Sequence, residues 1–289
     1  MSQQIPTAYI QSYGGNVIAL YQQAEAKLQG AVHEEPMKAK AHFFDRIEPT
    51  AAVLKTVRHG PTPIVDSPHS RRMVVMADYE WADLVDQQDE LRILIDPKSA
   101  YATNAVKALK RAYDDVVIEA FDADAKSGET GTTTVVFTDE DAGDEDFSAA
   151  AMDVEDLLTL KQLLDEQEVP AGDRFLLAAP SVISQLLRDA EISSADFQMV
   201  RNLVRGDIDT VLGFKVITSN RLPTVASTDK YGFAWHKESM GVAIGMPIKT
   251  NVSIRDDLSY ATQVYAAMTL GAARLQGKGV VRYRFDDAL

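Results

Sequence analysis

The chain has 289 residues, no cysteine and a formal net charge of −14, with 46% hydrophobic and 25% charged residues. This length allows one large domain or two smaller ones, and the lack of Cys excludes disulfides, thiolate nucleophiles and Cys-based metal sites. The charge argues against a protein that grips phosphates through stripes of Lys and Arg, but not against one that encloses nucleic acid. Solubility alone is the other explanation of the charge.

No targeting or membrane segment is predicted. The sequence contains no apolar run long enough to cross a bilayer. The first fifteen residues lack the positive segment and apolar core of a signal peptide. We therefore expect no association with a membrane.

The first 56 residues are predicted to form an arm rather than a core. Apolar residues at helical spacing predict a helix over residues 16–29, capped by Asn16 and ended by Gly30. Pro36 and Pro49 interrupt the stretch that follows. Such a segment suits an arm that lies along another surface, although an ordinary irregular N-terminal region is the alternative.

A two-stranded ribbon is predicted over residues 58–89, with its tip near residues 61–70. Three Pro and one Gly in residues 60–68 exclude a regular helix there. In the returning strand, Tyr79, Trp81 and Asp83 fall on one face. A ribbon of this length is only marginally stable alone in water, so we expect it to rest on its own body or on a neighbouring subunit. A lid over an enzyme site is the competing use.

The longest predicted helix covers residues 99–125 and follows Asp96 and Pro97. Apolar residues recur at three- and four-residue steps, as in an amphipathic helix. The predicted buried stripe consists of Tyr101, Ala105, Ala108, Ala112, Val116 and Ala120. The predicted solvated face, favoured over a binding site, consists of Lys107, Lys110, Arg111, Asp114, Asp115 and Glu119.

An acidic segment, residues 139–146, follows a predicted strand of β-branched residues at 132–138. Its spacing departs from a helix-loop-helix calcium site, because Gly143 stands fifth rather than sixth and Ala150 occupies the place of the bidentate Glu. A solvated loop is the preferred interpretation. Asp153 is predicted to cap a helix over residues 154–167.

Residues 169–223 are predicted to form a compact centre. A strand over residues 174–179 leads into a helix opened by Pro180, and Gly206 and Gly213 bracket a turn before a strand over residues 214–218. Residues 193–205 are a further helix or loop. The predicted later strands are residues 230–235, 242–244, 248–254, 261–270 (where a helix is also possible) and 280–285.

The sequence lacks the usual signatures of catalysis. The five His are scattered without paired metal spacing, and neither GxSxG nor GxGxxG is present. Residues 271–279 resemble a phosphate-binding loop, but the interval is one residue too long and Gly279 stands where Ser or Thr is needed. We therefore predict a non-enzyme with no catalytic residues, no cofactor and no metal site.

The order of these parts resembles the major capsid protein of tailed bacteriophages, the Hong Kong 97-like fold. The resemblance spans nearly the whole chain and is supported by three stretches: KRAYDDVVIEAFDADAKSG at residues 110–128, VP and DR at residues 169–174, and LGFKVI with SNRLP at residues 212–223. Each stretch alone is only moderately specific. Their order favours the phage group over encapsulin-type nanocompartments, which resemble the same fold.

The resemblance implies an α+β fold with a definite division of the chain. The expected parts are an N-terminal arm at residues 1–57, an E-loop at 58–95, a P domain with a long spine helix at 96–150, an A domain at 151–246, and return strands to the P domain at 247–289.

The resemblance also implies a structural function. Hexamers and pentamers of the chain would build an icosahedral head around double-stranded DNA, with assembly in the host cytoplasm. The implied partners are other copies of the chain, portal and scaffolding proteins and a possible cement protein. An encapsulin-type shell is the alternative, followed by a cytosolic enzyme with a long lid and by a tail or decoration protein.

The candidate intersubunit contacts are Arg58, Arg71, Arg72 and Trp81 on the predicted E-loop. We expect the three arginines to pair with a neighbour's carboxylates, each exposed pair contributing about 0–1 kcal/mol. Some members of the family cross-link through a Lys on the E-loop. Because residues 56–95 contain no Lys, we expect noncovalent assembly.

Overall fold

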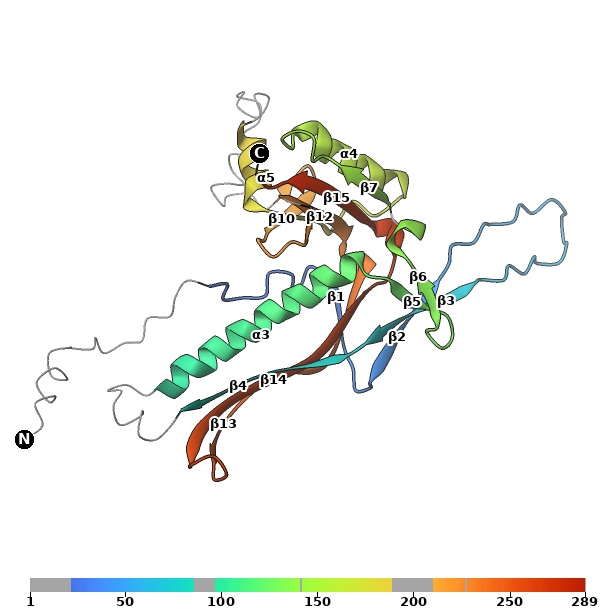
Figure 1. Cartoon of the computed structure of the whole chain (residues 1–289). Helices are drawn as coiled ribbons and strands as arrows, with labels where there is room; N and C mark the ends of the chain where they lie inside the picture. The colour runs from blue at the N-terminus through green and yellow to red at the C-terminus, as the bar shows by residue number, and fades with distance from the viewer. Residues whose placement is uncertain (1–21, 86–96, 141, 189–209, 227, 289) are drawn as a thin grey trace, which may run out of the picture. The chain divides into compact units, whose positions relative to one another are not determined.

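A computed structural model describes residues 22–85, 97–140, 142–188, 210–226 and 228–288 of the chain (Figure 1). The chain divides into two compact units, and each is built from three segments. The first unit comprises residues 1–26, 77–113 and 246–270, and the second comprises residues 27–76, 114–245 and 271–289. None of the helices described is long and apolar enough to cross a membrane. Helices and strands are mixed along the chain, which confirms the α+β prediction.

The long helix predicted after Asp96 is α3 (Pro97–Asp122), drawn as one continuous helix in Figure 1. It begins at a proline, which is preorganised for the first helical position. It ends three residues before the predicted end. At this end of the helix, Arg274 Nη1 donates hydrogen bonds to the carbonyl oxygens of Phe121 (2.9 Å) and Ala123 (3.2 Å). The guanidinium thereby satisfies carbonyls that the last turn leaves without a helical partner.

The predicted buried stripe of α3 is mostly wrong. Of its six members, only Ala105 and Ala120 are buried. The buried side follows a row at four-residue spacing, and four of its five members are larger than alanine and remove more apolar surface from water. This buried row consists of Ala105, Leu109, Tyr113, Val117 and Phe121.

Asp114 is another correction, since the sequence placed it on the solvated face and the structure leaves it 1% exposed. Its carboxylate accepts the backbone N–H groups of Lys27 (2.9 Å) and Leu28 (3.1 Å). The predicted helix at residues 16–29 is wrong over the described residues 22–29, which are irregular. Residues 16–21 lie outside the part described. These two amides therefore use the carboxylate of Asp114 on α3 as their acceptor, rather than carbonyls of their own segment.

Replacing Asp114 by Asn is expected to lower the free energy of unfolding by about 2–4 kcal/mol, because one of two amides bound to a buried charge loses its acceptor. Urea unfolding followed by circular dichroism measures the change. Asp124→Asn, at an exposed carboxylate just beyond the helix, is the control and is expected to stay within about 0.5 kcal/mol. Equal effects of the two changes would contradict this role for Asp114.

The first unit contains a long antiparallel pairing. β4 (Ala77–Val85) pairs with β14 (Ala261–Arg274), with Ala77 opposite Leu270 and Thr262 opposite Val85. Residues 261–270, for which the sequence also allowed a helix, are therefore a strand. β13 and β14 run through both units and form the middle of a sheet with the order β1-β13-β14-β4.

β13 (Met240–Arg255) is one strand where the sequence predicted two. β1 (His33–Pro36) pairs in parallel with β13 only as far as Ile244. Pro247 lies beyond this stretch, where that edge of β13 is no longer paired with β1. A proline costs little on an unpaired edge because its missing N–H has no ladder partner to lose.

The second unit is built on a seven-stranded sheet with the order β7-β15-β12-β8-β10-β9, in which β11 also pairs with β12. The described residues of this unit include the end of α3 and two further α-helices: α4 (Val154–Glu166), with the predicted Asp153 cap, and α5 (Pro180–Arg188). The strands are β7 (Gly143–Asp146), β8 (Arg174–Ala178), β9 (Thr210–Val211), β10 (Phe214–Thr218), β11 (Thr224–Ala226), β12 (Asp229–His236) and β15 (Val280–Asp286). The predicted strands near residues 174–179, 214–218, 230–235 and 280–285 and the helix opened by Pro180 are confirmed. Residues 193–205 and Gly206 lie outside the part described.

The acidic loop predicted at residues 139–146 is wrong in its second half. β7 pairs in parallel with β15, and alternate arginines of β15 bind its carboxylates: Arg282 binds Asp144 and Arg284 binds Asp146. A row of guanidinium groups on one face of β15 therefore neutralises the acidic side chains and permits pairing. The segment before it forms the 3-10 turn η1 (Phe137–Asp139).

The third sheet contains β2 (Ala41–Ile47), β3 (His69–Val75), β5 (Ala125–Ser127) and β6 (Thr133–Val135), in that order. The ribbon predicted over residues 58–89 is wrong in its pairing. β3 pairs with the earlier strand β2, while β4, one residue beyond β3, pairs with β14. Strand propensity identified β3 and β4 but could not identify their partners.

Candidate functional site

The candidate site in the second unit is the hairpin formed by β2 and β3, which exposes several large apolar side chains. The strands pair from Ala41 opposite Val75 to Ile47 opposite His69. Residues 48–68 connect them as a long loop without regular structure, drawn in light blue beyond the strands in Figure 1. Four prolines and Gly60 in this loop prevent a regular helix or ladder.

The hairpin loop exposes large apolar side chains. Leu54 is 82% exposed and Ile64 is 96% exposed, which is unusual for such residues. The exposed apolar group of the hairpin also includes Ile47, Val53, Val57 and Val65. Apolar surface gathered in one exposed segment marks an interaction site, because covering it with another protein removes it from water.

The four residues predicted as intersubunit contacts lie in different environments. Arg58 is exposed in the hairpin loop. Arg71 on β3 binds Asp45 on β2, with 3.0 Å between Nε and Oδ1, and its guanidinium lies 5.3 Å from the Phe43 ring centroid. Trp81 is half-buried on β4, opposite Ala266, and belongs to the first unit.

Arg72 is the exception among them, since it is 1% exposed and binds Glu140 of its own chain. Burial lowers the pKa of Arg72, and the nearby Arg46 guanidinium lowers it further, whereas Glu140 raises it. The Nε and Nη1 atoms of Arg72 have no hydrogen-bond acceptor among the residues described. An arginine enclosed in this way is unsuited to pairing with another subunit.

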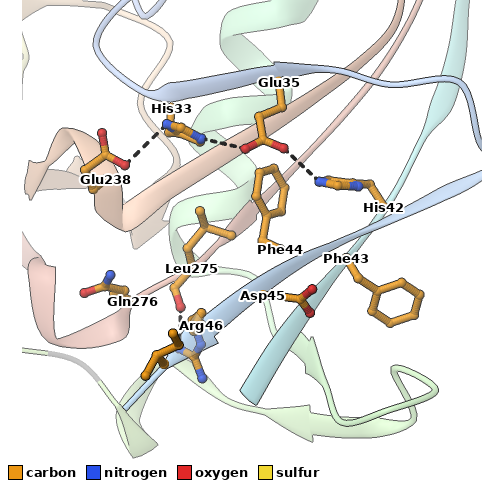
Figure 2. Close-up of a pocket in the computed structure, with 11 residues that line it drawn as sticks. His33, Glu35, His42, Phe43, Phe44, Asp45, Arg46, Glu238, Leu275 and Gln276 are labelled. Atoms are coloured by element: carbon orange, nitrogen blue, oxygen red, sulfur yellow. Dashed lines mark hydrogen bonds and ion pairs between the residues drawn. The ribbon is translucent and has the colours of Figure 1, made fainter. Parts of the chain in front are cut away.

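A cavity of about 350 Å³ lies at the base of the hairpin and involves residues that the sequence analysis did not single out. Figure 2 shows that His33 and Glu35 of β1, His42 of β2 and Glu238 of the turn η2 (Lys237–Ser239) form a chain of side chains along it. Phe44, Leu275 and Gln276 also line the cavity, with Phe43, Asp45, Arg46 and Ile47 of β2.

Glu35 is the centre of this chain. Its Oε1 lies 2.9 Å from His33 Nε2, and its Oε2 lies 3.1 Å from His42 Nε2. The hydrogen bond from His33 holds the pKa of Glu35 below its ordinary value, His42 acts in the same direction, and burial opposes both. The carboxylate therefore joins β1 to β2 while remaining ionised.

This arrangement is suited to holding strands together. Within the described residues no group of three or more His, Cys, Asp or Glu side chains has the geometry of a metal site. The alternation of His33 and Glu35 places both on one face of β1, which is a signal visible in the sequence. The signal went unused because this segment was expected to be irregular.

Comparison with known proteins identifies the family. A family model described as phage capsid protein matches residues 5–287. Comparison with curated proteins finds no match.

Solved capsid structures share the fold at low sequence identity. The capsid protein of Cyanophage P-SCSP1u has a TM-score of 0.74 and 15% identity, with 98% of this chain and 94% of that chain covered. The capsid of Cyanophage Pam1 has a TM-score of 0.70 and 13% identity, with 98% of each chain covered. The native GTA particle capsid has a TM-score of 0.70 and 12% identity, with 96% of each chain covered. The chain therefore belongs to the phage capsid protein family and is a structural major capsid protein of the virion, where it associates with itself in the capsid shell.

Proposed function

We propose that hexamers and pentamers of this chain assemble without covalent cross-links into an icosahedral head that encloses double-stranded DNA, in the cytoplasm of the host bacterium. Portal and scaffolding proteins, and a possible cement protein, are its proposed partners. The observation that carries the proposal is the hairpin loop, whose apolar side chains are exposed in the single chain. A neighbouring copy would cover them in the shell.

The backbone of β2 supports the same role for the hairpin. The N–H of Glu48 donates to Pro68 O (3.0 Å) and that of Met76 to Lys40 O (3.2 Å), so the even-numbered residues of β2 are hydrogen-bonded to β3. The odd-numbered residues direct their N–H and C=O groups to the outer edge, and β2 is an edge strand of the sheet described. An open edge of this kind accepts a segment of another copy.

The hairpin also revises the proposed division of the chain. We assign the E-loop to residues 41–75 rather than 58–95, with α3 as the spine helix. The A domain proposed at residues 151–246 corresponds to most of the seven-stranded sheet, but β7 and β15 of that sheet lie outside these bounds. The remaining candidate intersubunit contacts are Arg58, Arg71 and Trp81, while Arg72 is assigned to its own chain.

Lys55 lies within the hairpin loop, so the lack of Lys in residues 56–95 does not exclude a lysine cross-link from this hairpin. Noncovalent assembly predicts that purified shells, boiled in detergent, migrate as monomers on a denaturing gel. Weak contacts suffice for a shell because every copy makes many of them. A ladder of multimers that disappears in Lys55→Arg would show that the loop is cross-linked instead.

Electron microscopy of particles from cells expressing the full chain, followed by analysis of the contents of virions, tests the proposed function. Closed icosahedral shells, with nuclease-protected double-stranded DNA in virions, are expected. An enzyme cargo without nucleic acid would indicate a nanocompartment. Tubes or small oligomers alone would reject a head protein of this kind.

A further inference from the structure

His33 lies between two carboxylates, one on each side of its ring. Its Nε2 is 2.9 Å from Oε1 of Glu35, and its Nδ1 is 3.3 Å from Oε2 of Glu238 (Figure 2). A neutral imidazole carries a proton on only one nitrogen, whereas the protonated ring carries one on both. Both contacts are attractive only when His33 is protonated, because otherwise one nitrogen lone pair faces a carboxylate oxygen.

The other histidine of the cluster does not share this constraint. His42 Nε2 contacts Glu35 Oε2 at 3.1 Å, and a neutral ring with its proton on Nε2 can make that contact. The rest of the surrounding charge comes from Asp45 and Arg46 of β2, which line the same cavity, and from His236, whose Nδ1 accepts the backbone N–H of Glu238 at 3.3 Å. Burial lowers the pKa of His236, and Glu238 opposes this shift. The contact most sensitive to proton loss is therefore the one between His33 and Glu238.

The position of His33 makes this proton relevant to the hairpin. β1 leads directly into β2, and Glu35 joins the two strands through His42. Glu238 belongs to η2, which follows β12 of the seven-stranded sheet. His33 thus ties the base of the hairpin to the turn that ends a central strand of the second unit.

We propose that His33 is a pH-sensitive latch, which in its protonated form bridges Glu35 and Glu238 and holds the base of the β2–β3 hairpin against the turn η2. The bridge is complete when His33 is protonated and both glutamates are ionised. Loss of the His33 proton as the pH rises leaves a nitrogen lone pair facing a carboxylate oxygen, which weakens the bridge. In the shell, the position of the hairpin relative to η2 would then depend on pH, a consequence that rests on the proposed function.

Trp235 provides a local probe. Its Nε1–H donates to the carbonyl oxygen of Ala31 at 2.9 Å, two residues before His33. The chain contains two Trp, so Trp81→Phe leaves Trp235 as the single tryptophan, which can be excited selectively at wavelengths where Tyr absorbs little. Urea unfolding of unassembled full-length subunits can be followed by Trp235 emission. The urea concentration at the unfolding midpoint should decrease as the pH is raised from about 5.5 to about 8.

Three variants in this background distinguish the latch from a general effect of histidine. His33→Gln should lose most of the fall in midpoint. Glu238→Gln should also lose most of this decrease in midpoint. Its midpoint at the higher pH should match that of the parent, because the Gln amide can donate to the Nδ1 atom of neutral His33. His69→Gln, at an exposed histidine where β3 begins, should retain the full fall.

A midpoint that changes with pH in the same way in the parent and in His33→Gln, or a fall in midpoint that is retained in full by Glu238→Gln, would overturn the latch. Either result would leave shell formation by the parent chain unaffected. Conversely, the absence of shells at every pH would reject the proposed function. The urea unfolding experiment on subunits would still test the latch independently.

Discussion

Replacing Leu54 and Ile64 together by Asp is expected to abolish shell assembly while leaving the subunit folded. Both side chains are more than four-fifths exposed in the single chain, so charge at these positions costs the folded subunit little. In a shell the same positions would be covered by a neighbour. Two unpaired carboxylates would then be removed from water, at a cost of several kcal/mol for each contact.

Sedimentation velocity and electron microscopy measure assembly, and circular dichroism checks the fold. Thr50→Asp with Thr62→Asp is the matched control, because it adds the same charge to exposed polar positions of the same loop. The control is expected to form shells at near-normal yield. Shells of normal size from Leu54→Asp with Ile64→Asp would show that the loop's apolar side chains are not part of the intersubunit contact.

The elements that could be predicted from the sequence are those whose signals are local. Pro97 marks the start of α3, Asp153 caps α4, and Pro180 opens α5, and each acts within one turn of its own position. Alternation in residues 280–285 likewise predicted β15 with its arginines on one face. These signals depend on neighbouring residues and therefore do not require knowledge of the fold.

Partners distant in the sequence could not be predicted in this way. β3 is strand-like whether it pairs with β2 or with β4, and its real partner lies across the 48–68 loop. The stretches that carried the family resemblance also contact each other, since Arg221 binds Asp115, but spacing gave no sign of this contact. Pairing is decided by burial and side-chain fit summed over whole strands.

The candidate site was missed for the same reason. His33, His42 and Glu238 meet only after β1, β2 and η2 are placed, and the five histidines looked scattered in the sequence. Arg71 and Arg72 lie in different environments because adjacent residues of a strand point to opposite faces. Arg71 faces outward with Asp45, whereas Arg72 faces inward to Glu140.

Trp235→Ala is expected to produce the largest loss of stability. Trp235 is 0% exposed, and its ring centroid lies 4.7 Å from that of Phe121 on the spine helix and 5.6 Å from that of Phe175 on β8. Truncation leaves a cavity between helix and sheet and removes the hydrogen bond to Ala31. Losses of about 3–5 kcal/mol accompany such truncations.

The Leu54→Asp with Ile64→Asp subunit is the appropriate background for this measurement, because shell contacts would otherwise add to the stability of each copy. Urea unfolding by circular dichroism should rank Trp235→Ala well below Trp235→Phe, which keeps most of the ring but leaves the Ala31 carbonyl unpaired, at a cost of about 1–3 kcal/mol. Trp81→Phe, at a half-buried position on β4, should cost least.

If Trp235→Ala and Trp81→Phe were equally stable, the aromatic cluster around Trp235 would not be the centre of the second unit's core. If Trp235→Phe were as damaging as Trp235→Ala, the hydrogen bond that holds the arm, rather than ring packing, would dominate its contribution.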